Sequence, residues 1–174
     1  MSYKFGGLII RKADGISNEE VLTVLKKENF KAVRNVSMDE ATSGEFSQIG
    51  FSRIGDNVLV LNRDIAYSCS FDPAEPSKLN DRLELLSKGR GILCFHIFSP
   101  SGSYAWSIFE NGKWIRGRSV SDGASLSDFG KATVFDQNIE PNEDGVIKLI
   151  GNFLDKPFFS LIQDNDPKVK AYDS

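Results

Sequence analysis

The stretch RGILCFHIFSPSGSYAWSIFENGKWIRGRSV, residues 90–120, decides how this chain is interpreted. It contains three runs typical of β-strands, which are separated by a Pro-Ser-Gly turn and by Asn111-Gly112. The same stretch holds both tryptophans, the only histidine and one of the two cysteines. We therefore expect an antiparallel three-stranded unit here, with the rest of the chain packed around it.

Asn111-Gly112 is the strongest hairpin signal in the chain, because a type I′ turn needs positive φ at both central residues. A two-residue loop sets a register in which Phe109 opposes Trp114, and opposed residues share a face of the sheet. One predicted face is apolar and carries Tyr104, Trp106, Ile108 and Ile115, with Gly117 beneath the Trp106 ring. The other predicted face carries Ala105, Ser107, Phe109, Trp114, Arg116 and Arg118.

The second face is the predicted binding surface, and its candidate residues are Trp114, Arg116, Arg118 and Phe109. A guanidinium can lie over the tryptophan ring within the protein, or the group can present a cationic aromatic surface to a partner. Cross-strand packing or a covering helix explains the same pattern, and the sequence leaves these interpretations open.

His96 lies in ILCFHIF, a run that is apolar on both faces, where a lone histidine is typically a packed core residue. Its face depends on the loop at 99–103. If Phe98 opposes Tyr104, His96 joins Trp106 in the core; a loop one residue shorter places it on the side of Trp114. The second register favours a binding role, so His96 is included among the candidate binding residues.

The sequence predicts no catalytic residues, no metal site and no cofactor. Cys94 and His96 point the same way but lie about 6.5 Å apart along one strand, too far for a thiolate–imidazolium pair. The cysteines lack zinc-site spacing, and Gly89-Arg90-Gly91 follows a helix rather than the strand that precedes a phosphate-binding loop. Asp122 and Asp128 could bind a cation, but a solvated loop explains them better. These observations favour a protein that is not an enzyme.

The fold class predicted is α+β: a single domain over 1–163 with a largely antiparallel sheet, followed by a frayed tail over 164–174. Capping residues and apolar periodicity predict about three helices, which start near Ser17, Ser77 and Asn142. We expect these helices mainly on one face of the sheet. Residues 64–71 are expected to be extended or irregular, 121–130 a loop, and 131–135 a short strand. The polar segment 37–47 is expected to be an exposed loop, with a helical turn over 38–42 as an alternative.

Composition limits the partners of this 174-residue chain, whose net charge is −3. Nucleic acids and anionic membranes bind concentrated basic surfaces, so neither is an expected partner. No apolar segment approaches the roughly 20 residues of a membrane span, and no export signal is present. We therefore expect a cytoplasmic protein with reduced thiols. The oligomeric state is not predicted.

Residues 104–123, YAWSIFENGKWIRGRSVSDG, resemble a segment of small uncharacterised bacterial proteins. In those proteins an aromatic strand, an Asp/Asn-Gly turn, an arginine-bearing strand and a Ser-Asp-Gly loop follow one another, which implies a bacterial origin. In size, charge and fold class the chain is also similar to toxin-neutralising immunity proteins. The first hypothesis is thus a non-catalytic binding or accessory protein, which uses either the sheet-face aromatics and arginines or its acidic C-terminal helix (142–156) against a protein partner. The second is a small-molecule-binding protein or hydrolase-type enzyme with a pocket near His96 and Arg116.

Overall fold

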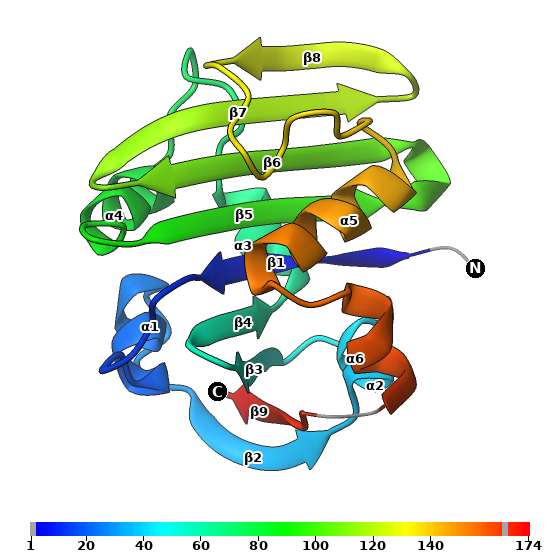
Figure 1. The fold of residues 1–174 in the computed structure, drawn as a ribbon. Helices are drawn as coiled ribbons and strands as arrows, with labels where there is room; N and C mark the ends of the chain where they lie inside the picture. Colours follow the sequence, from blue (N-terminus) through cyan, green and yellow to red (C-terminus); the bar gives the residue numbers. More distant parts are fainter. Residues whose placement is uncertain (1–2, 165–166) are drawn as a thin grey trace.

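An antiparallel sheet of nine strands forms the middle layer of the computed structural model, which describes residues 3–164 and 167–174 (Figure 1). The strands lie in the order β2-β9-β3-β4-β1-β5-β6-β7-β8. Their bounds are β1 (Lys4–Ile10), β2 (Lys31–Val36), β3 (Ile49–Ile54), β4 (Asn57–Leu61), β5 (Gly91–Phe98), β6 (Ser103–Glu110), β7 (Lys113–Ser121), β8 (Ala124–Phe129) and β9 (Val169–Asp173).

Helices cover both faces of this sheet. One face, here called the α4 face, packs against α1 (Asn18–Val24), α3 (Arg63–Ser68) and α4 (Lys78–Leu86). The other, the α5 face, packs against α2 (Met38–Ala41), α5 (Glu143–Leu154) and α6 (Phe158–Asp164). Figure 1 shows α5 crossing in front of β1 and β5. A single-turn 3-10 helix, Ser99–Ser101, links β5 to β6.

The α+β class and the antiparallel sheet are therefore confirmed for a single domain, but two details are wrong. The described residues contain six α-helices rather than about three, and they lie on both faces rather than mainly on one. The helices α3 and α6 contain too few turns to show an apolar period. Helix α2 coincides with the helical turn that the sequence allows at 38–42. Helices on both faces are needed because the central strands are apolar on both sides.

Strand β1 illustrates this burial on two sides. Leu8 and Ile10 are fully buried on the α4 face, and Ile9 is fully buried on the α5 face. Each such side chain contributes about 1.5–3 kcal/mol when it leaves water. Gly7 allows β4 to pair closely, since a Cβ there would lie 1.9 Å from the carbonyl oxygen of Val60.

The predicted helix starts are confirmed by their caps. The Ser17 hydroxyl accepts a hydrogen bond from the amide of Glu20, whose carboxylate accepts one from the amide of Ser17, as a capping box requires. Ser77 and Asn142 cap α4 and α5 through their side chains. These starts were predictable because the caps act within one turn of the chain.

Three segments differ from their expected conformation. Residues 63–68 form α3 rather than an extended piece, because the Asn62 side chain caps the helix at Ile65. Residues 124–129 form strand β8 rather than a loop, and Asp122-Gly123, with φ of 48° and 76°, makes the turn between β7 and β8. Residues 131–135 are not a strand.

The predicted frayed tail is also wrong for Val169–Asp173. This segment is strand β9, which pairs with both β2 and β3. Val169 and Ala171 are fully buried on the α5 face. Both partners lie more than a hundred residues earlier in the sequence, so no local pattern reveals the pairing. Residues 165–166 of the predicted tail lie outside the described residues.

None of the helices in the described parts of the chain is long and apolar enough to cross a membrane.

Candidate functional site

The hairpin of β6 and β7 has the predicted turn but a different register beyond it. Asn111 and Gly112 have φ of 51° and 83°, and Phe109 pairs with Trp114 as expected. Ile108 then pairs with Arg116 rather than with Ile115, because Ile115 is the extra residue of a β-bulge. A bulge changes the register by one residue and moves every later side chain of β7 to the opposite face.

The predicted face shared by Trp114, Arg116 and Arg118 is therefore wrong. Arg118 pairs with Trp106, and both arginines lie on the α5 face, whereas Phe109 and Trp114 lie on the α4 face. Tyr104, Trp106, Ile108 and Ile115 do share the α5 face, as predicted. Gly117 does not lie beneath Trp106; a Cβ there would meet the Phe129 ring at 2.3 Å.

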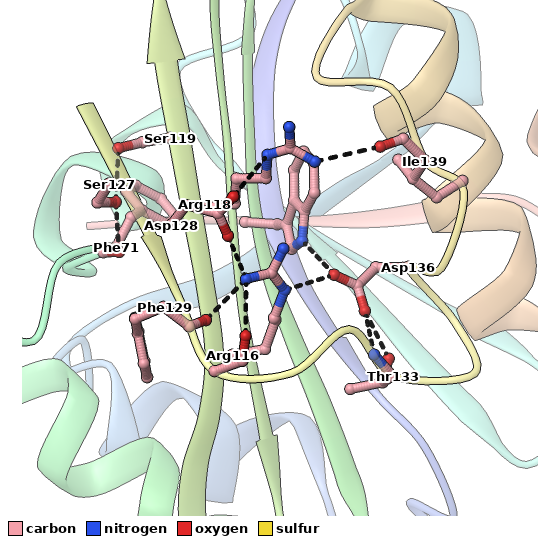
Figure 2. Close-up of polar contacts among 12 residues, drawn as sticks. Phe71, Arg116, Arg118, Ser119, Ser127, Asp128, Phe129, Thr133, Asp136 and Ile139 are labelled. Atoms are coloured by element: carbon pink, nitrogen blue, oxygen red, sulfur yellow. Dashed lines mark hydrogen bonds and ion pairs between the residues drawn. The ribbon is translucent and has the colours of Figure 1, made fainter. Parts of the chain in front are cut away.

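Arg116 is the centre of a buried polar network (Figure 2). Its Nε donates to Asp136 Oδ2 at 2.8 Å. Its Nη1 donates to Asp128 Oδ1 and to the carbonyl oxygens of Phe129 and Gly130, at 2.8 and 3.2 Å for the two carbonyls. The Arg116 side chain is only 6% exposed. The Arg116 side chain is therefore engaged by carboxylate and carbonyl groups of the protein itself.

Asp136 receives hydrogen bonds from three neighbours. Trp106 Nε1 donates to Oδ2 at 3.2 Å, and the amide and hydroxyl of Thr133 donate to Oδ1 at 2.6 and 2.8 Å. Burial by itself raises the pKa of Asp136, but the hydrogen bonds from Arg116, Thr133 and Trp106 outweigh burial and lower it. The carboxylate thus stays charged and ties residues 133–136 to the sheet.

Arg118 is partly exposed and lies over the Trp106 ring, 5.6 Å from its centre. Its Nη1 reaches the carbonyl oxygen of Ile139 at 3.5 Å, and its Nε lies 3.8 Å from Asp128. A cation–π contact of the predicted kind is therefore present, but it uses Trp106 rather than Trp114. Asp128 contacts two arginines, which explains it without a bound cation.

Trp114 and Phe109 lie under α4. Their rings stack with centroids 5.9 Å apart, and the Trp114 ring meets Phe129 edge-on at 4.9 Å. The Trp114 amide donates to Glu84 Oε1 of α4 at 2.9 Å, and its indole nitrogen donates to the carbonyl of Arg116. Phe109 is fully buried. This part of the sheet is covered by a helix, the alternative that the sequence left open.

His96 lies on the α4 face. Phe98 opposes Ser103, so the loop is one residue shorter than the core register required. The imidazole packs between Tyr67 and Phe98 and is only 9% exposed. Its Nδ1 has no hydrogen-bond partner among the described residues. Burial lowers the pKa of His96, so the ring is neutral at pH 7.

The structure therefore does not bring the five predicted residues together. Arg116 lies on the face opposite His96. Trp114 shares a face with His96 but is remote from it. Trp114 pairs with Phe109, which pairs with Ile92, and Ile92 is four residues or about 13 Å from His96 along β5. In the described residues, no group of three or more His, Cys, Asp and Glu could hold a metal. Burial raises the pKa of Cys94 well above its ordinary value, which keeps this thiol protonated.

An open groove lies beside α5 on the α5 face. The first hypothesis named this acidic helix as an alternative partner surface, but the groove itself was not predicted. It has a volume of about 720 Å³ and runs between residues 134–135, one side of α5 and the start of α6. Val134 and Phe159, which are 76% and 44% exposed, are among its lining residues. Its other lining residues are Phe135, Asp144, Ile147, Lys148, Gly151, Asn152, Asp155, Lys156, Pro157 and Phe158.

A smaller pocket of about 170 Å³ adjoins this groove at Phe135, which lines both. Its charged residues are Arg11, Lys12, Arg90 and Glu110. Arg11 separates the two cavities: its guanidinium lies over the Phe135 ring at 4.9 Å and pairs with Asp155 at 3.0 Å. We call this the basic pocket.

Two short apolar stretches, Val134-Phe135 and Phe158-Phe159, were the available sequence signal for the groove. The two stretches are more than twenty residues apart in the sequence, so no local pattern links them. Only the packing of α5 between them makes one surface. No family model, curated protein or solved structure matches this chain.

Proposed function

We propose that this chain is a non-catalytic binding protein that engages a protein partner through the groove beside α5. The observation that carries the proposal is the exposure of Val134 and Phe159, two apolar residues that line one groove. Apolar side chains this exposed contribute little to the stability of the free protein. Their burial by a partner favours binding, because it removes apolar surface from water.

The arrangement of the groove resembles a protein–protein interface. Its floor is formed by Phe135, Ile147 and Phe158, and charged residues stand around it. An apolar centre within a polar rim is typical of such interfaces, where the rim excludes water from a few central contacts. This location replaces the predicted surface around Trp114 and Arg116, whose side chains are occupied within the protein.

The second hypothesis, a small-molecule or hydrolase-type site that uses His96 and Arg116, has less support. The two side chains lie on opposite faces of the sheet. Arg116 is fully engaged by carboxylates and carbonyls. A binding role in the manner of an immunity or accessory protein needs no such pair, which favours the first hypothesis.

The test compares two substitutions of exposed apolar residues. Val134→Asp places a charge in the groove, and Leu126→Asp places the same charge on β8, where Leu126 is 65% exposed outside the groove. Proteins captured from the native lysate by the tagged wild-type chain are identified, purified and measured by calorimetry. We expect Val134→Asp to weaken the Kd for the true partner at least about tenfold, the effect of 1.4 kcal/mol, while Leu126→Asp leaves it unchanged.

A purified partner that binds Val134→Asp as tightly as wild type contradicts the proposal. A partner that is lost equally with Leu126→Asp does so too, because that result indicates a nonspecific effect of charge. Thermal unfolding of both variants shows that each remains folded.

A further inference from the structure

We propose that the basic pocket binds a carboxylate side chain of the partner, so that the groove selects an apolar segment that carries acidic residues. The inference rests on the proposed function and names the chemistry of its partner. Arg90 lines the basic pocket, and its Nε is buried without a hydrogen-bond partner among the described residues.

The Arg90 guanidinium is incompletely satisfied in the free protein. Its Nε–H is shielded from solvent and has no acceptor among the described residues. A shielded donor without an acceptor is unfavourable, because it has lost its hydrogen bonds to water, so such groups are rare and call for an explanation. A carboxylate in the basic pocket removes this cost, because a guanidinium that turns toward it can donate two parallel hydrogen bonds.

The charges around the pocket favour an anion. Arg11, Lys12 and Arg90 line it against a single acid, Glu110, in a chain whose net charge is −3. Arg11 is already paired with Asp155 and with the carbonyl oxygens of Asn152 and Phe153 at the end of α5. Arg11 is therefore held in place by groups of the protein itself, and Lys12 and Arg90 supply the positive charge that can pair with a ligand.

The position of the pocket explains why this anion belongs to an apolar segment. Phe135 lines both the groove and the basic pocket. A peptide that occupies the groove at Phe135 therefore has the basic pocket as its neighbour. Lys148 and Lys156 also stand along the groove, so the cations extend beyond one point. Several carboxylates along a segment complement this distribution, whereas one terminal carboxylate does not.

The proposed anion site is formed by the Arg90 side chain and not by a phosphate-binding loop at Gly89-Arg90-Gly91. The amide of Arg90 donates to the carbonyl of Ser87, and the Arg90 carbonyl accepts from the amide of Asn111. The backbone is thus engaged, and only the side chain of Arg90 is available to an anion.

The experiment uses three capped peptides and the 15N-labelled full chain in NMR titrations. The probes are acetyl-Phe-Leu-Glu-Glu-amide, its neutral counterpart acetyl-Phe-Leu-Gln-Gln-amide, and acetyl-Phe-Leu-Gln-Gln with a free terminal carboxylate. We expect all three to shift the amide signals of 134–135. The acidic peptide alone should also shift residues 89–91 and bind about tenfold tighter than the neutral one, as charge-assisted hydrogen bonds allow.

Arg90→Gln should abolish that preference and leave binding of the neutral peptide unchanged. Arg63→Gln is the matched control, because Arg63 is an exposed arginine at the start of α3 and lines neither cavity. Lys12→Gln is a second variant of the pocket and should reduce the preference for the acidic peptide. The amide spectrum of each variant shows whether it is folded.

Equal binding of the acidic and neutral peptides overturns the anion site and leaves the groove intact. A preference that survives Arg90→Gln, or that is also lost in Arg63→Gln, overturns the role of Arg90. If the terminal carboxylate binds as tightly as the acidic side chains, the assignment to side-chain acids is wrong. Failure of every peptide to shift 134–135 contradicts the proposed groove and the inference together.

Discussion

The segment 130–142 buries a polar side chain on the side that faces the sheet and exposes an apolar side chain on the other. Facing the sheet, Asp136 is fully buried and pairs with Arg116, Trp106 and Thr133. Facing outward, Val134 is 76% exposed and borders the groove. The buried side fixes the segment in place, and the exposed side can then present apolar groups in a defined position. Stability and binding are thus assigned to different side chains of one segment.

The largest expected effect comes from breaking the buried side. Asp136→Ala leaves the Arg116 charge without its buried partner, which costs about 3–5 kcal/mol of unfolding free energy. The Tm of a domain of this size should fall by about 10 °C. Urea unfolding and calorimetry measure both, with the exposed acid Glu28→Gln as control. A loss as small as that of Glu28→Gln would show that the network is not required for stability.

A smaller effect on stability is expected from His96, which is buried without a hydrogen-bond partner at Nδ1 among the described residues, in contrast with the paired Asp136. Burial lowers the pKa of His96 below its ordinary value of about 6.5. The unfolded chain therefore binds more protons than the folded chain as pH falls through 6.5, and the native state loses stability from there down to the lowered pKa. His96→Gln should flatten this part of the stability profile.

Urea unfolding of wild type and His96→Gln at pH 5 to 8 checks the sign. The pKa of Asp136 is lowered by its partners, so its own loss of stability begins at a more acidic pH, as the carboxylate becomes protonated. Identical slopes for the two proteins between pH 5 and 7 would contradict the account of His96.

The smallest expected effect is on the exposed side. Val134→Asp should change the unfolding free energy by no more than about 0.5 kcal/mol, because exposed positions away from buried networks tolerate substitution. The same variant is expected to weaken partner binding. A loss of several kcal/mol would mean that Val134 supports the fold, and the assignment of binding to this side of the segment would fail.

The β6–β7 hairpin could be predicted from the sequence near its turn but not beyond the bulge. The turn at Asn111-Gly112 and the pairing of Phe109 with Trp114 were predictable, because turn chemistry sets the first pairs. The bulge at Ile115 was not, and it moved Arg116 and Arg118 away from Trp114. No residue type marks the position of such a bulge, and only the pairing with the carboxylates of Asp128 and Asp136 accounts for the placement of Arg116.

The sequence by itself determined the elements that depend on neighbouring residues: the capped starts of α1, α4 and α5, the main turns, and an antiparallel sheet in an α+β domain. The tertiary structure alone decided the second layer of helices, the place of β9 between β2 and β3, and the groove beside α5. The reason is the range of the interactions. Caps and turns act over a few residues, whereas strand order and the surface that joins Val134 to Phe159 depend on contacts between distant segments.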